Sequence, residues 1–111
     1  MEQIKPRIIL KRQDRVDYVL SKTCDFFKVS PEILGAQYRN KKLYDRKRIA
    51  VKLLRDIADV TFEHIYLTFN STGPTAFWIC YNTINEDLAS PKGMNEELKE
   101  TYQKALNYLE V

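Results

Sequence analysis

The chain has 111 residues, 44% of them hydrophobic, and a formal net charge of +3, which together indicate one globular domain rather than a disordered segment. No stretch approaches the roughly 20 apolar residues that cross a bilayer, and the N-terminal residues lack the apolar core of a signal peptide. We therefore expect a cytoplasmic protein without a membrane partner.

Cysteine and histidine content bears on metal and catalytic chemistry. The chain has two cysteines, Cys24 and Cys80, and a single histidine, His64. The cysteines form no CxxC pair, and these three residues do not build a zinc site or a nucleophile–base set at the usual spacings. We expect reduced, half-buried cysteines, no cofactor and no enzymatic activity.

Basic residues are concentrated between positions 37 and 55. This segment has eight basic residues and one acidic residue, whereas residues 85–111 have six acidic residues and three lysines. A concentrated basic segment is typical of a nucleic-acid binder, and the alternative is an ordinary solvated helix face. The basic residues are Arg39, Lys41, Lys42, Arg46, Lys47, Arg48, Lys52 and Arg55.

The N-terminal half of the chain predicts an arm followed by three helices. Residues 1–12 form the expected arm, and 13–111 a single helical domain. Helical spacing of apolar residues predicts a first helix over 14–28. Ser30 and Pro31 indicate the N-cap and first position of a short helix that ends near Gly35. Residues 37–44 have no apolar period and predict a loop, after which Asp45 is the expected N-cap of a longer helix.

The C-terminal half predicts three more helices. Thr61 is the expected N-cap of a short helix, and a turn over 70–74 leads into a helix that ends near Leu88. A last helix begins near Asn95. Strand patterns are weak, so the predicted class is all-α with five or six helices. The expected buried stripe of the helix over 74–88 consists of Phe77, Trp78, Tyr81, Ile84 and Leu88.

The helices over 61–69 and 74–88, with the turn between them, form a candidate helix-turn-helix. In such a pair the second helix buries one face and offers the other to the major groove. The face opposite the predicted stripe holds Thr75, Ala76, Ile79, Thr83 and Glu86. Ile79 on this face has two interpretations, a contact to thymine methyl groups or part of a protein interface.

Three segments resemble one known family. The family's first helix ends with an aromatic pair and Lys-Ile/Val, like Phe26-Phe27-Lys28-Val29 here. Its next long helix has the form Arg-Lys/Gln-x-Ala-x-x-Leu, like Lys47-Arg48-Ile49-Ala50-Val51-Lys52-Leu53. The helix after it has the form Ser-Leu-x-x-Ile-Gly-x-x-Phe, like the segment from Thr61 to Phe69. Residues 26–84 thus resemble the C-terminal DNA-binding domain of the bacterial replication initiator DnaA, a helix-turn-helix domain similar to the Trp repressor.

The recognition-helix signature of that family is largely absent. The family has Gly-Gly-Arg-Asp-His-Thr-Thr-Val where this chain has residues 70–77, and only Thr75 matches. The resemblance implies that Arg39 is a minor-groove contact and that Lys47 is a phosphate contact. Arg48 stands where the family has Gln or Lys. The P-loop of an ATPase domain, G-x-x-x-x-G-K-S/T, does not occur in the chain.

These observations lead to one functional hypothesis and one alternative. The resemblance implies a helix-turn-helix module that binds double-stranded DNA in replication initiation or transcription control. The alternative is a protein–protein interaction module that kept the fold and lost its base-reading residues. The candidate DNA contacts are Arg39, Lys41, Lys42, Lys47, Arg48, Thr72, Thr75, Ala76, Ile79 and Thr83.

Overall fold

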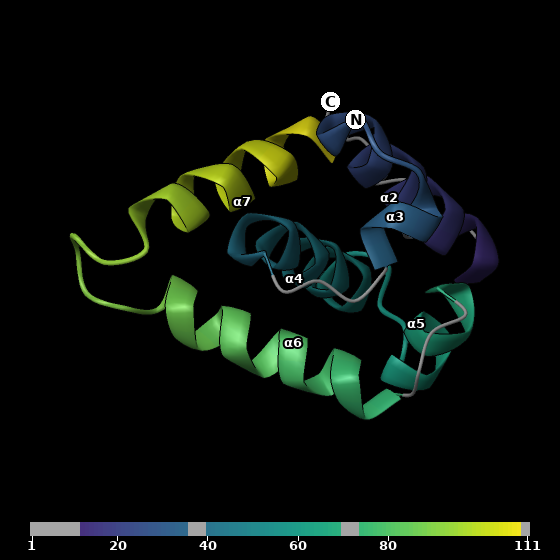
Figure 1. Cartoon of the computed structure of the whole chain (residues 1–111). Helices are drawn as coiled ribbons and strands as arrows, with labels where there is room; N and C mark the ends of the chain where they lie inside the picture. Colours follow the sequence, from purple (N-terminus) through teal and green to yellow (C-terminus); the bar gives the residue numbers. More distant parts are fainter. Residues whose placement is uncertain (1–11, 36–39, 70–73, 110–111) are drawn as a thin grey trace, which may run out of the picture.

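The computed structural model describes residues 12–35, 40–69 and 74–109, and this part of the chain contains helices and no strand. The predicted all-α class is therefore confirmed. None of the described helices is long and apolar enough to cross a membrane. The helices, labelled as in Figure 1, are α2 (Arg12–Phe27), α3 (Pro31–Gly35), α4 (Lys41–Asp56), α5 (Phe62–Phe69), α6 (Pro74–Leu88) and α7 (Glu96–Leu109).

Helix α4 is the centre of the fold, because it packs against every other described helix. Figure 1 looks nearly along α4, with α6 on one side of it, α2 and α7 on the other, and α5 near the start of α6. The buried residues of α4 cover all sides of the helix, which is the pattern expected of a helix that is surrounded. They are Lys47, Arg48, Ile49, Ala50, Val51, Leu53 and Leu54.

Most predicted helix boundaries are confirmed by capping hydrogen bonds. The Ser30 hydroxyl accepts the backbone N–H of Ile33 at 3.3 Å, which caps α3. The Thr61 hydroxyl accepts the N–H of His64 at 3.2 Å, which caps α5 in the same way. The helix over 74–88 is α6, and α7 begins one residue after the predicted Asn95.

The predicted start of α4 was wrong. Asn40 is the N-cap, and its side-chain oxygen accepts the backbone N–H groups of Lys42 at 2.9 Å and Leu43 at 3.2 Å. The segment 41–44, predicted as loop, is therefore the first turn of the helix, and Asp45 lies inside it. This turn has no apolar stripe of the usual kind, so hydrophobic periodicity did not reveal it.

The predicted buried stripe of α6 was wrong at one position. Trp78 is 55% exposed, whereas Phe77 and Ile84 are fully buried. Cys80, which is 2% exposed, occupies the inward position and lies 3.8 Å from the Tyr44 hydroxyl of α4. A small side chain at this position lets α4 and α6 approach closely, while Trp78 lies at the solvent edge of the stripe.

Two predicted segments lie outside the described residues. The expected N-terminal arm, 1–12, is described only at Arg12, where α2 begins. The expected turn, 70–74, is described only at Pro74, the first residue of α6.

Candidate nucleic-acid interface

Helices α5 and α6 are held together by aromatic contacts. The rings of Phe69 and Phe77 stack with centroids 5.7 Å apart, and those of Phe62 and Tyr81 meet edge to face at 5.5 Å. Such pairs add to the stability that burial of their area provides. Because Phe77 and Tyr81 point toward the core, the opposite side of α6 is left to solvent.

The solvent side of α6 carries two exposed apolar side chains, Trp78 at 55% and Ile79 at 45% exposure. Helix α6 contains no lysine or arginine. We call the shallow hollow on this side the α6 face. It is lined by Trp78, Ile79, Asn82, Thr83, Asn85, Glu86 and Ala89.

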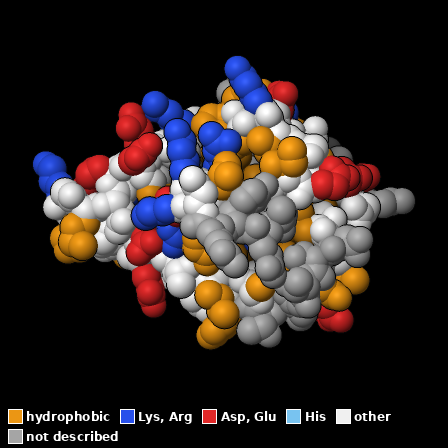
Figure 2. Space-filling model, viewed as in Figure 1, with side chains coloured by type: hydrophobic (Ala, Val, Ile, Leu, Met, Phe, Trp, Pro, Cys, Tyr) orange, Lys and Arg blue, Asp and Glu red, His pale blue; other side chains and the backbone are white. Residues whose placement is uncertain are grey.

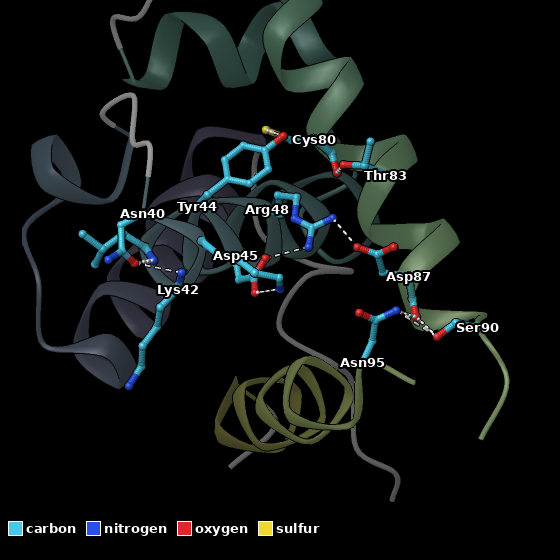
Figure 3. A network of polar contacts seen from close by, with 12 residues as sticks. Asn40, Lys42, Tyr44, Asp45, Arg48, Cys80, Thr83, Asp87, Ser90 and Asn95 are labelled. Carbon is cyan, nitrogen blue, oxygen red and sulfur yellow. Dashed lines mark hydrogen bonds and ion pairs between the residues drawn. The ribbon is translucent and has the colours of Figure 1, made fainter. Parts of the chain in front are cut away.

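The first turn of α4 carries two exposed cations. The side chain of Lys41 is 73% exposed, and its ammonium pairs with Asp45 at 2.9 Å. Lys42 is exposed, and Figure 3 shows its side chain extending away from the helix. Both cations lie at the N-terminal end of a helix, where the helix dipole is positive and favours an anion.

A chain of ion pairs holds the first turn of α4 beside α6. Asp45 accepts from Lys41 and also from Arg48 at 2.6 Å. The Arg48 guanidinium binds Asp87 of α6 at 2.8 Å with its other terminal nitrogen. Figure 3 shows this connection, with Tyr44 directed toward Cys80 and Thr83. The chain of ion pairs therefore joins this turn of α4 to the C-terminal part of α6, while the side chains of Lys41 and Lys42 line a hollow with residues of α2 and α7.

Two predicted phosphate contacts are buried. Lys47 and Arg48 are each 4% exposed. The Lys47 ammonium lies 5.2 Å from the centre of the Phe77 ring, and the Arg48 guanidinium lies 5.3 Å from that of Tyr44. Side chains held in this way pack α4 against α6 and do not present their charges to a duplex. The positions of the Lys47 and Arg48 side chains therefore do not support their predicted contacts to phosphate.

Arg48 remains charged in this environment. Burial acts to lower the pKa of its guanidinium, but hydrogen bonds to Asp45 and Asp87 outweigh that effect and raise the pKa above its ordinary value. The charge of Arg48 is therefore balanced inside the protein by two carboxylates.

Much of the remaining basic segment is also turned toward aromatic rings. The Arg46 guanidinium lies 5.5 Å from the Phe27 ring, and that of Arg55 lies 5.3 Å from Phe62. The Lys52 ammonium donates to Asp56 at 2.8 Å and to Asn85 at 2.6 Å. The concentration of basic residues in the sequence did not reveal this arrangement. The sequence feature that points to it is the content of seven tyrosines and five phenylalanines, which offer many aromatic partners to cations on a central helix.

Several predicted contacts cannot be placed. Arg39 and Thr72 lie outside the described residues, as does the side chain of Thr75 in the first turn of α6. Ala76 and Thr83 are half-buried. Of the ten predicted contacts, Ile79 and Thr83 line the α6 face, whereas Lys41 and Lys42 line a different hollow with residues of α2 and α7.

The cysteines and the histidine form no shared centre. Both cysteines are free and buried, and burial raises the pKa of each thiol. In the described part of the chain, no group of three or more histidine, cysteine or acidic residues could hold a metal ion. The candidate site is therefore the surface around α4 and α6.

Comparisons of the chain with protein-family models, curated proteins and solved structures gave no match. The likeness to the DnaA domain therefore rests on the sequence segments described above.

Proposed function

We propose that this chain binds duplex DNA through the first turn of α4 together with the α6 face. The observation that carries the proposal is the ion-pair chain from Lys41 through Asp45 and Arg48 to Asp87. It connects the turn that carries two exposed cations to α6, the second helix of the packed pair. The likeness to the DnaA domain supports the same surface, and replication initiation or transcription control is the setting we propose.

In this proposal the phosphate contacts come from Lys41 and Lys42, with the positive end of the α4 dipole. Asp87 of α6 is neutralised by Arg48 of α4. Glu86 is exposed beside Asp87, at the end of α6 that the ion-pair chain reaches, and opposes a close approach of phosphate there. Binding is therefore anchored at few points, and we expect it to be weak and to depend moderately on salt.

The test is a titration of a labelled random-sequence duplex followed by fluorescence anisotropy at several salt concentrations. Each neutralised phosphate contributes about −0.9 to the slope of log affinity against log salt, so two lysines predict a slope near −2. Lys42→Ala should make the slope shallower by about 0.9. Lys104→Ala is the matched control, because this lysine is 65% exposed and lines neither the α6 face nor the hollow that contains Lys41 and Lys42. Absence of binding at low salt, or an equal effect of both substitutions, would contradict the proposal.

A protein partner is the second candidate, and the exposure of Trp78 favours it. Tryptophan is enriched at protein interfaces, and a helix without cations suits an apolar partner. The same titration separates the two candidates, because a protein-interaction module need not bind duplex DNA at any salt concentration.

A further inference from the structure

The hollow that Lys41 and Lys42 line is formed by three helices, because residues of α2 and α7 complete it. We call it the basic hollow. Its volume is about 450 Å³, which is within the range of pockets that hold small molecules, and it is more enclosed than the α6 face. Figure 2 shows lysine and arginine side chains next to hydrophobic ones on the side of the molecule that faces the viewer.

The floor of the basic hollow is apolar. Phe26 and Phe27 of α2 contribute half-buried rings, which meet edge to face with their centroids 5.0 Å apart. Buried Ile49 of α4 and Leu98 of α7 line the same hollow. Aromatic rings pack well against other rings, face to edge or offset, so this floor favours a ligand with an aromatic body.

Two cations at the basic hollow have no carboxylate partner. The side chain of Lys42 is exposed and forms no ion pair with the described residues. The Arg46 guanidinium is half-buried and lies 5.5 Å from the centre of the Phe27 ring, where it is likewise unpaired. A planar guanidinium beside an aromatic floor can bind both oxygens of a carboxylate whose ring lies on that floor.

The acids of the basic hollow leave most of this charge uncompensated. Asp45 is already bound by Lys41 at 2.9 Å and by Arg48 at 2.6 Å. Glu97, near the start of α7, is exposed and has no ion pair within the described part of the chain. Two unpaired cations and one unpaired acid leave the equivalent of one positive charge, which suits a ligand with a single negative charge.

We infer that the basic hollow binds a small aromatic carboxylate. The ring of the ligand lies against Phe26 and Phe27, and its carboxylate accepts hydrogen bonds from the Arg46 guanidinium and the Lys42 ammonium. The inference does not rest on the proposed DNA binding, and its test needs no DNA.

The test is a titration of the labelled chain with naphthoate, followed by nitrogen–proton correlation spectra. We expect saturable shifts of the backbone amides of residues 26–27, 41–46 and 97–101. The neutral amide of the same ring, naphthamide, should bind about tenfold more weakly, because it forms no charge-assisted hydrogen bonds. Acetate, which lacks the ring, should give no saturable shifts. Equal binding of naphthamide, equal binding of acetate, or no binding of naphthoate would overturn the inference.

Arg46→Gln removes the cation that lies nearest to the floor and should weaken naphthoate binding by about tenfold. Arg55→Gln is the matched control, because Arg55 is on the same helix and lies 5.3 Å from the ring of Phe62, but does not line the basic hollow. Equal losses in the two variants would overturn the inference. If Arg46→Gln lost the helical circular dichroism spectrum, Lys42→Ala at its exposed position would replace it, with an expected loss of about fivefold.

Glu97→Gln tests the charge of the basic hollow in the opposite direction. Removal of this acid should tighten naphthoate binding by about threefold and leave naphthamide binding unchanged. A selective gain of this kind does not arise from damage to the fold. An unchanged or weaker affinity for naphthoate would mean that the carboxylate does not lie near Glu97, and would overturn the inference.

Discussion

Lys47 and Arg48 show that a basic residue in a basic segment is not necessarily a surface residue. Each is 4% exposed, and each charge lies against an aromatic ring. Long aliphatic stems allow lysine and arginine to pass through an apolar layer, and rings and carboxylates can then hold the charged ends. The sequence shows where basic residues are concentrated but not where their side chains point, because that direction depends on how α4 packs against the other helices.

Replacing Arg48 tests this account at the level of one residue. Arg48→Met keeps much of the side-chain volume but leaves Asp45, which is 17% exposed, without its guanidinium partner. We expect the free energy of unfolding to fall by about 3 kcal/mol, measured by urea denaturation. Lys42→Ala, at an exposed site, should change it by less than about 0.5 kcal/mol. A fully stable Arg48→Met variant would show that the ion pairs contribute little.

The two thiols provide a second test at this scale. Cys24 is 7% exposed and Cys80 is 2% exposed, and burial raises the pKa of both. Because the thiolate is the reactive form, both cysteines should react much more slowly with an aromatic disulfide reagent in the native protein than in urea. Rapid labelling of Cys80 in the native state would mean that α6 separates from α4 frequently.

At the level of elements, capping residues predicted the helix boundaries more accurately than the spacing of apolar residues did. Ser30 and Thr61 each accept the backbone N–H that their positions predicted. The start of α4 was predicted wrongly because Asn40, its N-cap, precedes a polar turn. The next acidic residue, Asp45, is also of a type that commonly forms an N-cap. The composition of a cap is local and can be read from sequence, whereas the choice between two candidate caps depends on the neighbouring helices.

Asn40 should therefore control the first turn of α4. Its side-chain oxygen accepts two backbone N–H groups, so Asn40→Ala should lower the free energy of unfolding by about 1 kcal/mol. Asn40→Asp keeps an acceptor oxygen and should retain most of the stability, measured by the same denaturation. If alanine and aspartate had equal effects, the side-chain cap would not be the source of stability.

The contact of α7 with α4 and α6 predicts a pH dependence at high pH. Burial, assisted by the charges of Asp56 and Tyr81, raises the pKa of Tyr102 from 10.0 to about 12. The folded chain then holds this proton at pH values where the unfolded chain has lost it. Stability should accordingly fall as the pH rises from about 10 to about 12.

Tyr102→Phe isolates this contribution, because the variant has no hydroxyl to titrate. Its stability should decline less steeply over the same pH range than that of the wild type. The tyrosinate absorbance that the substitution removes should appear near pH 12 in the native protein. If the absorbance that the substitution removes titrated near 10.0, the ordinary value, α7 would not shield Tyr102 from solvent.

At the level of the whole molecule, the formal charge of +3 overstates the attraction for DNA. The fold pairs or buries many cations of the basic segment, and the described exposed ones at the start of α4 are Lys41 and Lys42. The sequence predicted the helix count and most boundaries because these follow from local patterns. It predicted the candidate site only in part, since the exposure of Trp78 and the burial of Lys47 arise from packing between helices.

The central claim is that the first turn of α4 and the α6 face form one DNA-binding surface. The most direct measurement is a nitrogen–proton correlation spectrum of the labelled chain, recorded with and without a short duplex at low salt. We predict that the shifted backbone amides belong to Lys41, Lys42 and residues 76–86, while those of residues 102–109, beyond the hollow that the two lysines line, stay in place. Shifts confined to α2 or α7, or no shifts at a large excess of duplex, would contradict the account.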